Sequence, residues 1–254
     1  MGIEIKTADE IAAMREAGMI VYEVLEQLEK LVEPGITLEE LDQAARRETE
    51  NRGATCAFMG LYGFPKHICI SVNDQVVHGI PGKRKLQEGD LVKLDHGAVV
   101  RGWYGDSART VAVGKISPEA RKLVEVTRES LEAGIQAMAV GNRVSDIGAA
   151  VEAVVSPHGY GIVRDYVGHG IGKRPHEDPQ VPNYGPALWG RGQPNPRLRA
   201  GLVLAVEPMI NVGTHETLTL GDGWTVVTKD GKYSAHFEHT IAVTENGPEV
   251  LTRP

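Results

Sequence analysis

Several acidic residues stand where a buried strand would normally hold an apolar side chain. The runs LVKLD and LVLAVE end on Asp95 and Glu207, and Glu238 directly precedes the apolar run HTIAVT. A buried ionised carboxylate is unfavourable unless it is paired or bound to a metal ion. Each acid alone could be an ordinary strand-end residue, but together they indicate a metal site built from oxygen ligands.

A fourth acid, Asp106, is connected to Asp95 by the spacing between them. Residues 93–108 read as a β-hairpin that turns near 100–102, across which the two acids would lie roughly opposite one another. Their numbers sum to an odd value, as partners on one face of a hairpin with a two-residue turn require. Two carboxylates this close would force one to stay protonated unless cations are present. Bound metal ions would resolve that conflict.

Three of the nine histidines are singled out by the short motifs that contain them. His169 lies in VGHGIG, His78 in VVHGIP and His176 in RPHED. Glycines on both sides of His169 allow the backbone to come close to a ligand or metal. The other histidines are interpreted as structural or exposed side chains: His67, His96, His158, His215, His236 and His239.

The first part of the chain reads as two helices followed by strands. The T-x-x-E patterns at 7–10 and 37–40 are capping boxes, and they predict helices to about residue 30 and to just before Gly53. From His67 the pattern changes to short β-type runs separated by Gly, Pro, Asn and Asp.

The second part repeats that order. Ser117-Pro118 supplies an N-cap and a first-turn proline for a helix to about residue 139, and Ser145 is expected to cap a helix that ends near 157–159. Strand-like runs return from residue 201 onward. We predict an α+β fold in which helices cover one side of a largely antiparallel sheet. One domain, residues 1–254, would consist of halves at about 1–115 and 116–254.

Residues 181–201 are the least regular part of the pattern. Four prolines and several glycines disfavour a helix or a central strand there. We expect a long surface loop and assign no role to it.

Composition places the chain among ordinary globular proteins. Hydrophobic residues make up 41 % and charged residues 24 % of its 254 residues, and no apolar run is long enough to span a bilayer. The charged N-terminus is unlike a signal peptide, and the two cysteines, Cys56 and Cys69, fit a reducing cytosol. A net charge of −7 argues against broad nucleic-acid binding. We expect a cytoplasmic protein with neither a membrane nor a nucleic acid as partner.

A series of short motifs runs through nearly the whole chain. The motifs are HGIP at 78–81, LDHG and RGWYGDSA within 94–108, GHGIG at 168–172, PHEDPQVPNYG at 175–185, VEPM at 206–209, and DGWTVVTKDGKYSAHFEHTIAVT at 222–244. In this order and spacing they resemble the type I methionine aminopeptidases of peptidase family M24, in the bacterial form without an N-terminal extension. The resemblance implies the pita-bread fold, in which two pseudo-symmetric halves pack their helices outside a curved, mainly antiparallel sheet.

The resemblance also implies the roles of individual residues. Two divalent ions would be held by Asp95, Asp106, His169, Glu207 and Glu238. Such ligands suit Co, Mn, Fe or Zn without choosing among them. Glu207 would act as general base, His176 would bind the scissile carbonyl oxygen and His78 would contact the amide nitrogen. The implied reaction is removal of the initiator methionine from nascent polypeptides with a small second residue, by attack of a hydroxide that bridges the two metals.

The family's substrate pocket matches five positions here. They are Phe58, Leu61, Phe64, Cys69 and Trp224. An apolar, partly aromatic cup with a polarisable sulfur suits an unbranched thioether. The family often has tyrosines where this chain has Leu61 and Phe64. The expected partner is the N-terminal Met of nascent peptides, with transient association with the ribosome, and the protein is expected to be a monomer.

Three related readings compete with this one. Xaa-Pro peptidases of the same fold carry an additional N-terminal domain, whereas this chain begins directly with the catalytic unit. Type II methionine aminopeptidases carry a long insertion, for which the 31 positions between Glu207 and Glu238 leave little room. Non-enzymatic binding proteins of the fold have typically lost metal ligands, and all five are present here.

Overall fold

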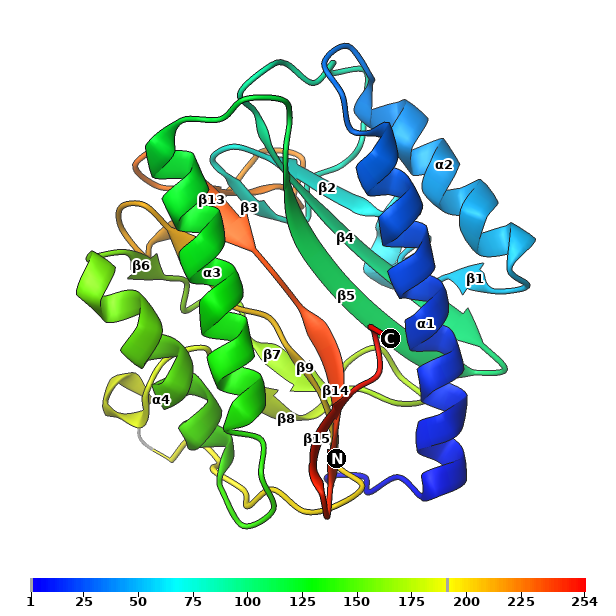
Figure 1. The fold of residues 1–254 in the computed structure, drawn as a ribbon, viewed down its shortest axis with the longest axis vertical. Helices are drawn as coiled ribbons and strands as arrows, with labels where there is room; N and C mark the ends of the chain where they lie inside the picture. The colour runs from blue at the N-terminus through cyan, green and yellow to red at the C-terminus, as the bar shows by residue number, and fades with distance from the viewer. Residues whose placement is uncertain (1, 191) are drawn as a thin grey trace.

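The computed structural model describes residues 2–190 and 192–254, in which an order of helix, helix and strands occurs twice (Figure 1). The first set consists of α1 (Ala8–Leu31), α2 (Leu38–Asn51), β1 (Thr55–Cys56), a 3-10 turn (Leu61–Gly63), β2 (Cys69–Val72), β3 (Gln75–Val77), β4 (Leu91–Val100) and β5 (Trp103–Ala112). Thr7 and Thr37 each accept a hydrogen bond from the backbone of the glutamate three residues on, and that glutamate bonds back to the threonine backbone. Both predicted capping boxes are confirmed.

The second set has shorter strands. It consists of α3 (Pro118–Gln136), α4 (Val144–Val155), a 3-10 turn (Ser156–His158), β6 (Gly161–Ile162), β7 (Gly168–Gly170), β8 (Glu177–Val181), a 3-10 turn (Pro186–Leu188), β9 (Val203–Val206), β10 (Met209–Asn211), β11 (Thr217–Thr219), β12 (Val226–Thr228), β13 (Ser234–His236), β14 (His239–Thr244) and β15 (Gly247–Val250). Ser117 caps α3 as predicted, although the helix ends about three residues early.

The predicted cap of α4 is wrong. Ser145 lies inside the helix, and the N-cap is Arg143, whose backbone N–H donates to the Asp146 carboxylate at 2.7 Å. The helix start is therefore marked by the acid at its third position, which accepts the N-cap backbone N–H, and not by a capping serine. The Ser145 hydroxyl instead accepts a hydrogen bond from Asn195 of a distant loop.

Every strand pair within the described residues is antiparallel. The pairs form four groups, ordered β1-β4-β2 with β5 on β4, β13-β10-β6, β11-β12-β3, and β15-β14-β9-β7-β8. A bridge between Ala108 of β5 and Glu238 joins the strands of the first set to those of the second. The predicted α+β class is confirmed.

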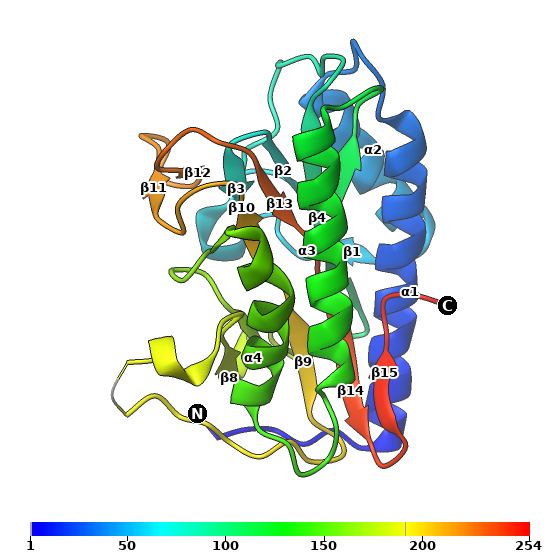
Figure 2. The same cartoon turned by 60° about the vertical axis from the view of Figure 1, so that its left-hand side comes forward.

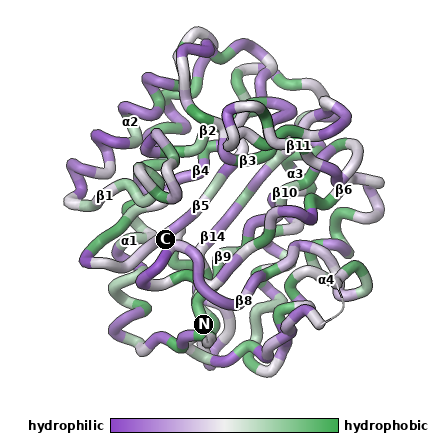
Figure 3. Tube along the Cα trace, turned by 180° about the vertical axis from the view of Figure 1, so that it is seen from behind, coloured by the Kyte–Doolittle hydropathy of each residue, from purple (hydrophilic) through white to green (hydrophobic). Residues whose placement is uncertain are grey.

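The helices cover one side of the strands. They lie toward the viewer in Figure 1, and in Figure 2 α1 and α2 lie at the right and β11 and β12 at the left, whereas the strands come forward in Figure 3. One apolar core lies beneath α1 and α2, and two others lie beneath α3 and α4. The element order agrees with two similar halves, and their boundary near residue 115 stays a prediction.

The hairpin predicted from the acidic spacing is confirmed. Strands β4 and β5 pair without interruption from Leu91 opposite Ala112 to Val100 opposite Trp103, around a turn of Arg101 and Gly102. Both turn residues have positive φ, as a two-residue hairpin turn of type I′ requires. This register places Asp95 opposite Ala108 and Asp106 opposite Gly97, so each acid lies two positions from the partner of the other. The two acids are diagonal neighbours on one face.

The prediction for residues 181–201 is partly wrong. Apart from the end of β8 and one 3-10 turn, the described residues form no long helix or strand, as the prolines indicated. Residues 181–185 are nevertheless buried, because Asn183 donates to the Glu207 carbonyl and Tyr184 packs in the core beneath α4. No helix in the described part of the chain is long and apolar enough to cross a membrane.

Candidate active site

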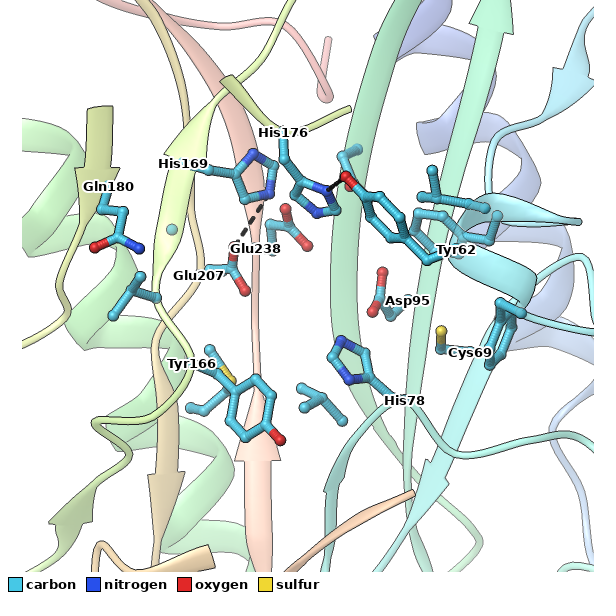
Figure 4. Close-up of a pocket in the computed structure, with 18 of the residues that line it drawn as sticks. Tyr62, Cys69, His78, Asp95, Tyr166, His169, His176, Gln180, Glu207 and Glu238 are labelled. Atoms are coloured by element: carbon cyan, nitrogen blue, oxygen red, sulfur yellow. Dashed lines mark hydrogen bonds and ion pairs between the residues drawn. The ribbon is translucent and has the colours of Figure 1, made fainter. Parts of the chain in front are cut away.

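One cavity brings together all the residues that the sequence singled out for chemistry. Its volume is about 600 Å³, and its lining includes side chains from β2, β4 and β5 on one side and from β7, β8 and Glu207, directly after β9, on the other (Figure 4). The predicted residues that line it are Asp95, Asp106, His169, Glu207, Glu238, His78, His176, Phe58, Leu61, Phe64, Cys69 and Trp224. The cavity therefore lies between the two sets of elements.

Asp106 is held at a junction between the first and second sets. Its backbone N–H donates to the Thr240 hydroxyl at 3.0 Å, and that hydroxyl donates to the Asp106 carbonyl at 2.8 Å. Thr240 belongs to β14, so β5 is fixed against the second set at the position of the acid. A Cβ on Gly97, which pairs with Asp106, would lie 2.8 Å from Ala57 and 3.0 Å from Phe58. Only glycine fits there without a shift.

The backbone at the glycines around His169 lies close to the neighbouring strands, as the sequence predicted. A Cβ on Gly168 or Gly170 would come within 2.3 Å of a carbonyl oxygen of a neighbouring strand. His169 Nδ1 lies 2.9 Å from the Gly170 carbonyl oxygen, which can only accept, so Nδ1 carries the proton. The Nε2 lone pair is therefore free, and it faces Glu207 Oε1 at 3.4 Å. This tautomer is the one that a metal-binding imidazole needs.

The two glutamates are positioned by backbone contacts. Glu207 directly follows β9, and its carbonyl accepts from Asn183 Nδ2 at 3.1 Å. The Glu238 backbone N–H donates to the Ala108 carbonyl at 2.9 Å, and its carbonyl accepts from the Ser107 hydroxyl at 2.6 Å. Strand β5 thus carries one acid of the cluster and holds another in place.

The electrostatics of this cluster fit a divalent ion. Burial, reinforced by neighbouring carboxylates, raises the pKa of Asp106, Glu207 and Glu238 well above the usual range, and burial also raises that of Asp95. Asp106 Oδ1 and Glu238 Oε1 are buried without a hydrogen-bond partner among the described residues. Ligand atoms of Asp106, His169 and Glu238 all lie within 4.8 Å of one another. Unpaired oxygens and a free imidazole nitrogen are a donor set for hard or borderline cations.

Two further histidines face the cluster. The His176 ring lies 4.4 Å from the His169 ring between centroids, and its Nδ1 is 3.4 Å from the Tyr62 hydroxyl. His78 packs edge-on against Tyr166 at 5.4 Å and has a φ of 60°. Burial lowers the pKa of His78 to about 4 and also lowers that of His176, so both rings are neutral at neutral pH. A left-handed conformation in a residue other than glycine is a strain that often marks a functional position.

The five predicted pocket residues form one apolar cluster at the side of the carboxylates. Phe64 and Trp224 pack edge to face at 5.2 Å, with Phe58, Leu61 and Cys69 completing the cup. Cys69 pairs with Asp95 across β2 and β4, so the cup directly adjoins the acids. Cys69 and Cys56 are both free thiols.

Comparison with known proteins places this architecture in a family. The sequence profile of metallopeptidase family M24 matches residues 12–245. The methionine aminopeptidase of Clostridium perfringens is 52 % identical over 250 residues, which cover 98 % of each chain, and methionine aminopeptidase 1 of Bacillus subtilis is 51 % identical over 248 residues, 98 % of each. The chain belongs to the methionine aminopeptidases of metallopeptidase family M24.

The solved structures of this family agree with the fold. The crystal structure of methionine aminopeptidase from Thermotoga maritima superposes with a TM-score of 0.95 at 43 % identity and covers both chains completely. The expectation of a pita-bread fold is confirmed. As a member of a metallopeptidase family the protein is a hydrolase that uses divalent metal ions.

Three residues of the cavity region contact the predicted site residues, although the sequence patterns gave them no part in the chemistry. Tyr62 stacks on His176, Glu177 lies next to His176, and His236 lies behind Glu207 and Glu238. The expectation that His236 is merely structural or exposed does not account for its place beside two acids of the cluster. One signal was available, because His236 and Glu238 are two positions apart in an extended segment and therefore share a face.

The raised carboxyl pKa values predict a pH-dependent affinity for metal. Divalent ions bind the ionised form, so loading the metal-free protein at roughly pH 6 to 8 is expected to release protons. His169 contributes none, because burial lowers its pKa to about 3 and leaves it neutral. Affinity should therefore rise with pH, about tenfold per pH unit for each proton released. Calorimetric titration with Mn²⁺ in buffers of different ionisation enthalpy measures this release.

The Asp95→Asn variant should release fewer protons than the wild type, whereas Asp222→Asn, on an exposed turn, should match it. A binding heat that is independent of the buffer would contradict this account of the cluster.

Proposed function

We propose that the protein removes the initiator methionine from nascent polypeptides, preferring a small second residue. The observation that supports this most directly is the junction of the apolar cup with the carboxylate cluster, at the Cys69 and Asp95 pair. A side chain seated in the cup would bring its own backbone carbonyl to the carboxylates. Two divalent ions would be held by Asp95, Asp106, His169, Glu207 and Glu238.

The chain's own groups can bind and move protons around the scissile bond. When bound, the ions lower the pKa of a shared water and polarise the carbonyl. Glu207 would accept the proton of the attacking water on Oε2 and pass it to the leaving amine. The Tyr62 hydroxyl would donate to His176 Nδ1, which leaves Nε2–H of His176 to bind the carbonyl oxygen as charge develops. His78 would contact the amide nitrogen.

The setting proposed for this reaction is the cytoplasm, where nascent chains and reduced thiols are found. Transient association with the ribosome and a monomeric state belong to the same proposal. The specific ions are proposed only as a group, Co, Mn, Fe or Zn, because the ligand set suits all four.

The test of this function is a peptide panel. Met-Gly-Met, Met-Lys and Ala-Pro are assayed with protein loaded with Mn, Fe, Co or Zn. We expect rapid release of Met from Met-Gly-Met, slow release from Met-Lys because the second residue is large, and none from Ala-Pro. Preferential cleavage of Ala-Pro would instead support an Xaa-Pro peptidase. No cleavage of any peptide at saturating metal would support a binding protein of the same fold.

The apolar cup predicts a specific kinetic effect. Replacing Trp224 by Ala removes the ring that packs on Phe64, so the methionine side chain loses contact area in both ground and transition states. We expect KM for Met-Gly-Met to rise roughly tenfold or more, with a smaller change in kcat. Leu218→Ala, at an exposed position outside the cavity lining, is the control and should keep both constants. An unchanged KM in Trp224→Ala would show that this ring does not contact the substrate's methionine side chain.

A further inference from the structure

His236 lies directly behind the two glutamates of the carboxylate cluster. Its Nε2 is 4.0 Å from Glu207 Oε2 and 3.9 Å from Glu238 Oε2, and its side chain is only 2 % exposed. Neither ring nitrogen has a hydrogen-bond partner within the described chain. A buried imidazole without partners is unfavourable, and buried polar groups in native proteins are nearly always satisfied. A small shift of the ring would therefore bring Nε2 within hydrogen-bonding distance of the Oε2 atoms of both glutamates.

The backbone of His236 leaves the ring little freedom to turn elsewhere. The His236 backbone N–H donates to the Thr110 hydroxyl oxygen at 2.9 Å, and the same hydroxyl donates to the His236 carbonyl at 2.8 Å. His236 also pairs with Met209, two positions after Glu207. Contacts on both sides thus fix the residue with its ring toward the glutamates.

The two oxygens of the Glu207 carboxylate face different histidines. Its Oε1 faces His169 Nε2 at 3.4 Å, on the side of the other ligand atoms, while its Oε2 faces His236. A metal-binding carboxylate is typically hydrogen-bonded through a partner behind it, which fixes its rotamer and tunes the site. His236 occupies that position for both glutamates.

We propose that His236 is a positioning residue whose Nε2–H donates to the Oε2 atoms of Glu207 and Glu238 and so keeps their Oε1 atoms turned toward the metal ions. The proposal rests on the proposed function in so far as these glutamates hold the ions. Each carboxylate oxygen has two lone pairs, so Glu207 Oε2 keeps one for the proton of the attacking water.

The experiment compares His236→Leu, which lacks a donor, with His236→Gln, whose side-chain amide can replace the N–H. Metal-free protein is titrated with Mn²⁺, and free Mn²⁺ is followed by its electron paramagnetic resonance signal. We expect the Leu variant to bind Mn²⁺ about 10 to 100 times more weakly, and the Gln variant to stay within about threefold of the wild type. His239→Leu is the matched control and should keep the wild-type affinity for Mn²⁺, since His239 is a partly buried histidine whose Nδ1 lies 2.8 Å from the Thr252 hydroxyl.

Nitrogen couplings to bound Mn²⁺ test the same proposal in the wild type and in His236→Gln, so this test does not depend on the folding of the Leu variant. One coupled imidazole nitrogen, from His169, is expected in wild type and in His236→Gln. A second nitrogen that disappears in His236→Gln would make His236 a direct ligand and overturn the proposal. Wild-type Mn²⁺ affinity in His236→Leu would also overturn it.

The outcome is separable from that of the proposed function, because no peptide is present in the titration. If the wild type cleaved Met-Gly-Met and His236→Leu bound Mn²⁺ as tightly as the wild type, the positioning role alone would be refuted. A wild-type protein that binds no Mn²⁺ would refute both.

Discussion

Replacing Glu207 by Gln is expected to lower kcat by about 10² to 10⁴-fold, because the amide cannot accept the proton of the attacking water. The substitution keeps the size of the side chain and one oxygen that can face His169, where Glu207 Oε1 now lies at 3.4 Å. Loss of turnover should therefore exceed loss of metal affinity. The measurement is kcat for Met-Gly-Met at saturating Mn²⁺, together with a Mn²⁺ titration of the same preparation.

Glu207→Ala removes both the base and the ligand oxygen, and it should lower metal affinity as well as kcat. Glu245→Gln, an exposed change of the same chemical type, should leave both quantities as they are. If Glu207→Gln retained full turnover while loaded with metal, Glu207 would not be the base. Proton transfer would then have to be assigned to another group in the cavity.

The parts of the site that could be predicted from sequence are those whose partners are close along the chain. Asp95 and Asp106 belong to one hairpin, and the turn between them fixes which face each occupies. The exact turn, Arg101 and Gly102, decides whether they are opposite or diagonal, and the sequence left that choice open. His169 was found because its flanking glycines report a close backbone approach, which the structure has on both sides.

The parts that could not be predicted depend on the register of distant strands. Nothing near His236 in sequence shows that β10 places it beside Glu207, and Met209 opposite His236 is known only from the folded sheet. Similarly, Ser145 fits the N-cap composition, but the cap is decided by Asp146 and by Asn195, which comes from a loop 50 positions away. Local propensity is a weak guide wherever a tertiary partner competes for the same group.

The same kind of long-range contact connects the N-terminal segment to the active site. Lys6 Nζ lies 2.5 Å from Glu177 Oε2, and the two side chains are 3 % and 1 % exposed. The Lys6 backbone N–H also donates to the Gly201 carbonyl at 2.7 Å, which fixes the segment. Glu177 directly follows His176 and begins β8, so this ion pair fixes the start of the strand next to His176, which lines the cavity.

We expect Lys6→Met to be strongly destabilising, because it leaves the Glu177 carboxylate buried without its cation. Breaking a buried pair from one side typically costs about 3 to 5 kcal/mol. For a chain of this size that corresponds to a fall of roughly 6 to 20 °C in Tm. Thermal unfolding is measured on metal-free protein, since bound ions stabilise the folded state by mass action and would mask the difference.

The exposed pair of Lys229 and Glu216 is a matched control, with 2.8 Å between its charged atoms and both side chains 51 % exposed. Lys229→Met should cost less than about 1 kcal/mol, because water solvates the carboxylate that remains. The double variant Lys6→Met with Glu177→Met should recover most of the stability lost in Lys6→Met, since no unpaired charge is left inside. If Lys6→Met cost no more than Lys229→Met, the buried pair would not secure the strand. The effect depends on burial, because the two pairs contain the same kinds of charged group at similar distances.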